Sequence, residues 1–201
     1  MLDGVARKAI DPYLDSLGKA LAARGASANS VTIAGFAFGV SAAGAIALNY
    51  HWLGAVLILL SRLCDGLDGV VARQTKTSDF GGYLDIVLDF AFYGIIPLSF
   101  AFAAWETNGL AAATLIFSFY VNGASFLAYA ILAEKHKEVS EARGKKSIFF
   151  TTGLAEATET LAVFIAACIW PMWFPVLAYG FAAVCIYTAV VRIAEAKVQF
   201  S

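Results

Sequence analysis

The chain has 201 residues, of which 60% are hydrophobic and only 14% are charged, and its mean hydropathy is +0.74. These values lie far outside the usual range of soluble domains and indicate a membrane protein. The formal net charge is −1, and no nucleic-acid partner is expected.

The first 27 residues predict an amphipathic helix ahead of the membrane-spanning part. Apolar residues recur there at helical spacing between charged residues, namely Ile10, Tyr13, Leu14, Leu17 and Leu21. This pattern is typical of a helix that lies in the membrane interface. We therefore expect residues 1–27 to form a cytoplasmic interfacial helix.

The rest of the chain predicts an all-α bundle of six membrane-spanning helices. Apolar runs about 20 residues long are needed to cross a bilayer, and they occur at 30–50, 53–72, 81–104, 109–133, 148–170 and 175–194. We expect one domain over 1–201, with the six-helix bundle over 28–201.

The charges predict an orientation. The joins between spans one and two, three and four, and five and six are short and contain no Lys or Arg, whereas all 14 Lys and Arg fall at or near the opposite ends. By the positive-inside rule, both termini then face the cytoplasm. Tryptophans gather at the ends that lack Lys and Arg, as an aromatic belt would require: Trp52, Trp105, Trp170 and Trp173. We expect a multi-pass protein of a bacterial inner membrane, with its active site on the cytoplasmic side.

Four aspartates lie at the cytoplasmic ends of the second and third predicted spans. Asp65 and Asp68 are three residues apart, and Asp85 and Asp89 are four apart, so each pair shares one face of its helix. An unpaired charge at bilayer depth costs roughly 2.5–3.5 kcal/mol on insertion scales, so a cation is expected between them. Hard carboxylate oxygens suit Mg²⁺ or Mn²⁺, and two such ions about 4 Å apart can clamp a phosphate.

Glycines and an arginine accompany the acids. Gly66, Gly69, Gly81 and Gly82 each cost a helix about 1 kcal/mol relative to Ala, so close approach of a ligand or of another backbone is expected there. Arg73 lies one turn beyond Asp68 and offers a planar donor for phosphate. Helix packing and contact with lipid headgroups are the alternative reading of these residues.

The constellation resembles the signature of the CDP-alcohol phosphotransferases, DxxDGxxAR followed by GxxxDxxxD. The matching residues are Asp65, Asp68, Gly69, Ala72, Arg73, Gly81, Asp85 and Asp89. Seven residues separate Arg73 from Gly81, one fewer than is usual in the family. Six spans behind an interfacial helix are also similar to the family's architecture.

The resemblance implies two divalent cations, Mg²⁺ or Mn²⁺. It assigns one ion to Asp65, Asp68 and Asp85, a second shared by Asp85 and Asp89, and the role of general base to Asp89. It also implies residues that contact the CDP group, which are Gly69, Arg73, Ser78, Asn29, Ser30, Val31 and Thr32. Ser78 is the hydroxyl position counted back from Gly81; counted forward from Arg73, that position falls on Asp79.

The implied reaction transfers a phosphatidyl group from a CDP-linked lipid, such as CDP-diacylglycerol, to an alcohol and releases CMP. Membrane lipids and a second copy of the chain, in a homodimer, are the other partners that the resemblance implies. The acceptor stays open among inositol phosphate, glycerol phosphate, serine and other alcohols. An intramembrane prenyltransferase that binds a diphosphate through Mg²⁺, and a divalent-cation transporter, are the alternative functions.

Other polar residues allow two readings each. Arg143, Lys145 and Lys146 either hold an acceptor phosphate or only follow the positive-inside bias. Glu156 and Glu159 either recognise the acceptor or bond between helices. In the fourth span, polar contact between helices is favoured over ligand binding for Ser118, Asn122 and Ser125.

Overall fold

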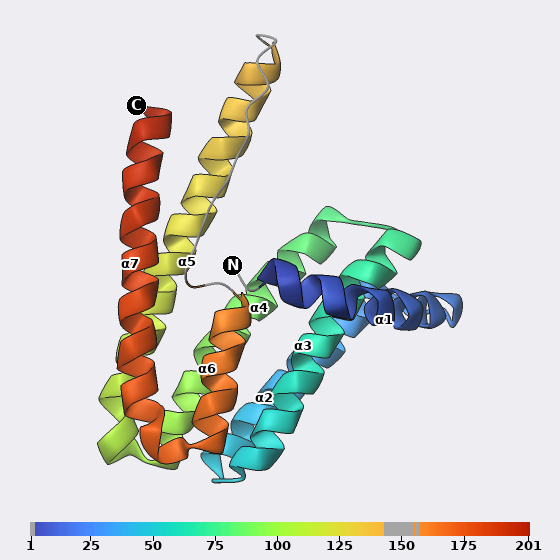
Figure 1. Cartoon of the computed structure of the whole chain (residues 1–201). Coiled ribbons are helices and arrows are strands. Elements are labelled where there is room, and N and C mark those ends of the chain that lie inside the picture. Colours follow the sequence, from blue (N-terminus) through green and yellow to red (C-terminus); the bar gives the residue numbers. More distant parts are fainter. Residues whose placement is uncertain (1–2, 143–154, 156) are drawn as a thin grey trace.

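The computed structural model describes residues 3–142, 155 and 157–201, with side chains at 12–136, 155 and 157–201. All regular elements in that part of the chain are helices (Figure 1). They are α1 (Asp3–Ala23), α2 (Ala28–Ala47), α3 (His51–Gln74), α4 (Asp79–Ala103), α5 (Trp105–Ala142), α6 (Ala157–Ile169), the short 3-10 helix η1 (Pro171–Trp173) and α7 (Phe174–Phe200). The all-α prediction is confirmed for these residues.

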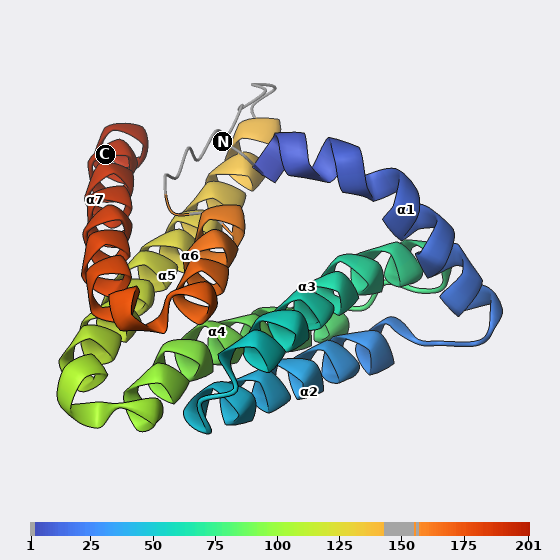
Figure 2. The same cartoon turned by 60° about the horizontal axis from the view of Figure 1, so that its bottom comes forward.

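The helices form two groups that meet along α4 and α5. Helix α2 packs against both α3 and α4, while α7 packs against α5, and α3 also contacts α6. Helix α1 lies across one end of the first group and contacts α3 (Figures 1 and 2). The short joins α2–α3, α4–α5 and α6–α7 lie together at the opposite end (Figure 1).

Local chemistry explains several helix limits. The Ser27 hydroxyl accepts a hydrogen bond from the Ser30 amide and caps α2, and Ser78 caps α4 through the Gly81 amide in the same way. Helix α2 was predicted to reach residue 50 but ends at Ala47, because Asn49 adopts a positive φ of 65° and turns the chain into α3. The chain can therefore reverse direction within three residues.

Within the described ranges, four helical segments are long and apolar enough to cross a membrane: Ala28–Ala47, Asp79–Ala103, Trp105–His136 and Pro171–Phe200. Helix α3 has 24 residues, a sufficient length. Because it contains Arg62, Asp65 and Asp68, this helix is too charged to be recognised as a membrane span from its composition. Helix α6 has 13 described residues, and the predicted start of that span, at 148, lies outside the described residues. The count of six spans, like the interfacial position of α1, stays a prediction.

Small residues bring α2 very close to its neighbours. A Cβ atom added at Gly35 would lie 2.9 Å from the Cys64 Cβ of α3 and 3.2 Å from the Ser61 carbonyl oxygen. At Gly39 it would lie 2.7 Å from the ring of Phe92 on α4. Contacts this short leave no room for a methyl group, so these glycines set the separation of α2 from α3 and α4.

Candidate metal and nucleotide site

Three carboxylates from α3 and α4 converge beside α2, the helix that packs against both of them. Asp65 and Asp68 come from α3 and Asp85 from α4, and each offers one oxygen that lies within 4.8 Å of the others. Asp68 is only 7% exposed. Three hard oxygen ligands at this spacing fit a divalent cation such as Mg²⁺ or Mn²⁺. The prediction that these three residues converge agrees with the geometry.

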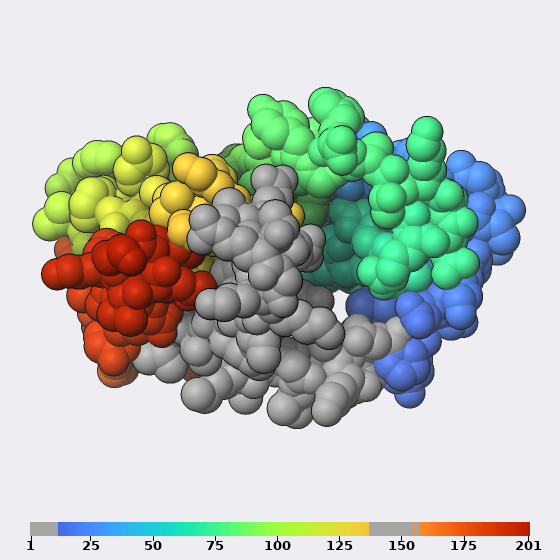
Figure 3. All heavy atoms as spheres, turned by 90° about the horizontal axis from the view of Figure 1, so that it is seen from above, coloured from blue at the N-terminus to red at the C-terminus, as the bar shows by residue number. Residues whose placement is uncertain are grey.

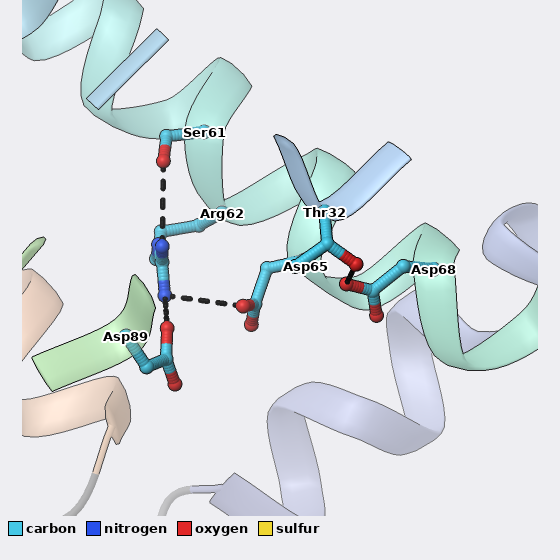
Figure 4. Close-up of polar contacts among 6 residues, drawn as sticks. All are labelled: Thr32, Ser61, Arg62, Asp65, Asp68 and Asp89. Carbon is cyan, nitrogen blue, oxygen red and sulfur yellow. Dashed lines mark hydrogen bonds and ion pairs between the residues drawn. The ribbon is translucent and has the colours of Figure 1, made fainter. Parts of the chain in front are cut away.

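A hydroxyl from α2 holds one of these carboxylates. The Thr32 Oγ1 lies 2.6 Å from the Asp68 Oδ2 and 3.0 Å from the Ala28 carbonyl oxygen, and both the threonine and the aspartate are buried. A hydroxyl has one proton to donate, and the shorter distance indicates that Thr32 donates it in a hydrogen bond to the Asp68 carboxylate (Figure 4). The Thr32 hydroxyl, predicted to contact the nucleotide, therefore orients Asp68 in this structure.

Arg62 joins the cluster, although it was not among the functional residues predicted from the sequence. Its Nη1 donates to the Asp89 Oδ1 at 2.6 Å and lies 3.4 Å from the Asp65 Oδ1. Its Nη2 donates to the Ser61 hydroxyl at 3.3 Å (Figure 4). The signal available in the sequence was its position three residues before Asp65, which places both on one face of α3.

Asp89 differs from the other three aspartates. It is absent from the group whose oxygens converge within 4.8 Å, and its Oδ1 is bonded to Arg62. In the part of the chain that the structure describes, this is the only hydrogen bond of the Asp89 carboxylate. Asp85 and Asp89 line the same small cavity, and the second cation site that the family resemblance implies for them stays a prediction.

Two cavities meet at Asp89. The smaller lies among α2, α3 and α4 and is lined by Thr32, Arg62, Asp65 and Asp85 as well as Asp89. The larger, of about 600 Å³, lies among α4, α5, α6 and α7, and aromatic and aliphatic side chains form most of its wall. Among the described residues, Asp89 is the one that lines both.

The residues predicted to contact CDP lie at the neighbouring ends of α2, α3 and α4. The Asn29 Oδ1 lies 3.0 Å from the position of a Cβ at Gly81, beside the Ser78 hydroxyl that caps α4. A Cβ atom added at Gly69 would lie 3.5 Å from the Arg73 Nη1, so the exposed guanidinium lies over that glycine. From this end, Figure 3 shows the surface hollowed next to α3 and the start of α4.

Two members of the predicted nucleotide set have structural contacts instead of free side chains. The Val31 side chain is 8% exposed and packs in a small apolar cluster with Leu67 and Val71. The Ser30 hydroxyl donates to the Ser27 carbonyl oxygen at 2.7 Å. Only the backbone of Val31 remains available to a ligand.

The weaker sequence signals have mixed outcomes. Arg143, Lys145, Lys146 and Glu156 lie outside the described residues. Polar contact between helices, which the sequence favoured for the fourth span, is found at two of its three residues: the Asn122 and Ser125 side chains of α5 both accept hydrogen bonds from Arg192 of α7. The Ser118 hydroxyl bonds within its own helix, to the Leu115 carbonyl oxygen.

Fold and site together define an all-helical membrane protein whose helices gather carboxylates suited to a divalent cation. The sequence model of the CDP-alcohol phosphatidyltransferase family matches residues 26–193, and the chain belongs to this family. Its members are enzymes that transfer substituted phosphate groups in phospholipid synthesis, so the resemblance seen in the sequence is confirmed. A prenyltransferase or a cation transporter does not fit this assignment.

Among curated proteins, the inner membrane protein YnjF of Escherichia coli is 42% identical over 193 residues, which cover 96% of this chain and 94% of that protein. An archaetidylinositol phosphate synthase of Pyrococcus horikoshii is 37% identical over 90 residues, 44% of this chain and 47% of its own length.

Solved structures of a phosphatidylinositol phosphate synthase of Mycobacterium tuberculosis share the fold. The complex with manganese and citrate has a TM-score of 0.67 at 21% identity and covers 90% of this chain and 87% of that one. The form with CDP-DAG bound has a TM-score of 0.62 at 21% identity and covers 90% and 92%.

Proposed function

We propose that this protein transfers a phosphatidyl group from a CDP-linked lipid, such as CDP-diacylglycerol, to an alcohol and releases CMP. The observation that carries the proposal is the convergence of Asp65, Asp68 and Asp85 within a chain of this family. The bound CDP-DAG and manganese in structures of the same fold support the choice of donor and of cation type.

Asp65, Asp68 and Asp85 would hold a divalent cation, Mg²⁺ or Mn²⁺. When bound there, the ion supplies positive charge for the diphosphate of the donor. The Thr32 hydroxyl keeps the Asp68 carboxylate turned toward this point, because its hydrogen bond fixes one of the two carboxylate oxygens.

The CDP group would lie at the ends of α2, α3 and α4. The Arg73 guanidinium is exposed beside Gly69 and is free to bind a phosphate or a cytosine carbonyl. The start of α2, from Asn29 to Thr32, and Ser78 at the start of α4 would form the other wall, and backbone amides at helix N-termini attract anionic groups. Val31 would contribute through its backbone.

Asp89 would act as the general base. It stands between the small cavity that holds the other carboxylates and the large cavity beyond α4, so an acceptor in the large cavity meets Asp89 before it meets the donor. The acceptor hydroxyl gives its proton to the Asp89 carboxylate while its oxygen bonds to the lipid-side phosphorus. The bond from that phosphorus to the oxygen of CMP breaks.

The proposal includes a place in the cell. We take the protein to cross a bacterial inner membrane six times, with both termini and the site in the cytoplasm, and to form a homodimer. The inner-membrane location of the Escherichia coli relative supports the compartment. The exposed tryptophans Trp52, Trp105 and Trp173, at the joins without Lys or Arg, support the orientation.

The test uses purified full-length protein with CDP-diacylglycerol, Mn²⁺ and a panel of alcohols that includes inositol phosphate, glycerol phosphate and serine. CMP release is followed by chromatography, and the lipid product is identified by mass spectrometry. We expect one acceptor to give both CMP and a new phospholipid.

The Asp89→Asn variant serves as the mechanistic control, since it keeps the size of the side chain and removes the base. It should stay folded and lose CMP release, because loss of a general base costs about 10²–10⁴-fold in rate. No product with any acceptor would refute the proposed reaction. Turnover close to wild type in Asp89→Asn would remove Asp89 from the role of base.

A further inference from the structure

Helix α1 packs tightly across the end of α3 (Figure 1). Gly18 of α1 is buried, and a Cβ atom added there would lie 2.4 Å from the Val70 Cγ1 and 2.7 Å from the Val70 Cβ. A Cβ atom added at Gly66 of α3 would lie 3.0 Å from the Leu14 Cδ1 of α1. Each helix thus places a glycine against a side chain of the other, and the two backbones come closer than side chains on both would allow.

The part of α3 that contacts α1 is also the part that carries two of the converging carboxylates. Gly66 and Val70 alternate along the chain with Asp65 and Asp68. Because an α-helix has 3.6 residues per turn, the two pairs lie on nearly opposite faces of the same turns. One face contacts α1, and the other bears the carboxylates that converge with Asp85. A shift of this stretch of α3 relative to α1 would therefore move both aspartates.

A defined turn also connects α1 to the start of α2. Gly25 has a positive φ of 84°, and the Ala26 amide donates a hydrogen bond to the Leu21 carbonyl oxygen at 3.1 Å. This is the pattern of a Schellman motif, which ends a helix and fixes the direction of the chain that follows. The chain that follows is α2, whose Thr32 hydroxyl bonds to Asp68. Helix α1 is thus linked to the acidic cluster by a second route.

A small apolar cluster fills the space among α1, α2 and α3. Its buried members are Val31, Leu67 and Val71, and α1 contributes the partly buried Leu14, Leu21 and Ala22. Because protein interiors are close-packed, three helices that share such a cluster cannot shift independently.

We infer that α1 is a positioning element of the active site, in which Leu14 and Gly18 hold the stretch of α3 that carries Asp65 and Asp68. Through this contact and the turn into α2, α1 sets the spacing of the carboxylates that bind the cation. The inference rests on the proposed function, because it assigns a positioning role in the same site.

The main test is Gly18→Ala in full-length protein purified in detergent. The Val70 Cβ is fixed to the backbone of α3 and cannot rotate away, so the added methyl group must separate the two helices. We expect the folded variant to bind Mn²⁺ about 10-fold or more weakly than wild type, since loss of support for a metal ligand costs about 10–100-fold in affinity. The free ion is followed by its electron paramagnetic resonance signal during a titration.

A matched control makes the same change where nothing is contacted. In Gly180→Ala, on α7, no atom lies within 4 Å of the added Cβ, and Mn²⁺ affinity should equal that of wild type. A compensating change at the contact should restore binding. The three atoms nearest to a Cβ at Gly18 all belong to the Val70 side chain, so Gly18→Ala combined with Val70→Gly should regain most of the lost affinity.

A second pair of variants keeps the inference testable if Gly18→Ala does not fold. Leu14→Ala removes packing against α3 without adding a clash, and it should also weaken Mn²⁺ binding. Leu17→Ala removes the same atoms from a side chain of α1 that is 51% exposed, and it should bind Mn²⁺ as wild type does.

Unchanged Mn²⁺ affinity in folded Gly18→Ala or Leu14→Ala would overturn the inference, even with a lower melting temperature, because α1 would then contribute stability alone. An equal loss of affinity in Gly180→Ala would overturn it as well, since the effect would not depend on the contact with α3. Binding of no Mn²⁺ by the wild type would overturn the inference and the proposed metal site together. A wild type that binds Mn²⁺ but releases no CMP with any acceptor would refute the proposed function, and the comparison of Mn²⁺ affinities would still decide the role of α1.

Discussion

Replacing Thr32 by valine tests whether the α2 hydroxyl supports the metal site. The side chain is 9% exposed and its Oγ1 lies 2.6 Å from the Asp68 Oδ2. Valine has nearly the same shape but no donor. A hydrogen bond to a charged group contributes about 1.5–3 kcal/mol, and loss of a partner that orients a metal ligand weakens metal binding about 10–100-fold. Since a tenfold change in affinity corresponds to about 1.4 kcal/mol, the two ranges agree, and Thr32→Val should bind Mn²⁺ about 10–100-fold more weakly than wild type.

The assay is a titration of Mn²⁺ into purified Thr32→Val, with the free ion followed by its electron paramagnetic resonance signal. Thr32→Ser keeps the hydroxyl and is the matched control, which should bind Mn²⁺ within about threefold of wild type. Unchanged Mn²⁺ affinity in Thr32→Val, combined with weaker binding of CDP, would refute the reasoning. It would mean that the hydroxyl serves the nucleotide and not Asp68.

Two other changes test the packing and the metal requirement. Gly35→Ala should lower the melting temperature, since its methyl group would meet Cys64 and a backbone oxygen of α3, an overpacking that costs about 1–3 kcal/mol. Gly44→Ala, on the same helix with nothing within 4 Å, should melt at or above the wild-type temperature, because alanine is the better helix former. Equal melting of the two variants would contradict the close approach at Gly35. Removal of divalent ions with EDTA should abolish CMP release, and added Mn²⁺ or Mg²⁺ should restore it; turnover that persists in the chelator would rule out a metal-dependent reaction.

The convergence of three aspartates could be predicted because it depends only on local rules. Helical spacing puts Asp65 and Asp68 on one face, and the short join of residues 75–78 keeps the start of α4 close to the end of α3. Asp85, near the start of α4, then falls opposite them. No knowledge of packing angles was needed.

The environment of Asp89 could not be predicted in this way. Whether its carboxylate joins the other three or pairs with Arg62 depends on how α3 and α4 are rotated about their axes, which helical spacing leaves open. In the sequence, Arg62 counted only as one of the positive charges near the cytoplasmic side. Whether the Thr32 hydroxyl bonds to Asp68 likewise depends on how closely α2 packs against α3. The contacts at Gly35 and Gly39 set that distance.

The face of α2 that packs against its neighbours also links the acidic cluster to the orientation of this helix. Thr32, Gly35 and Gly39 follow one another at intervals of three and four residues, so the support of Asp68 and the tight packing lie on one stripe of the helix. A helix adapts to bilayer thickness by tilting. A tilt of α2 in a thicker or thinner bilayer would therefore move the Thr32 hydroxyl that holds Asp68, and with it one carboxylate of the proposed cation site.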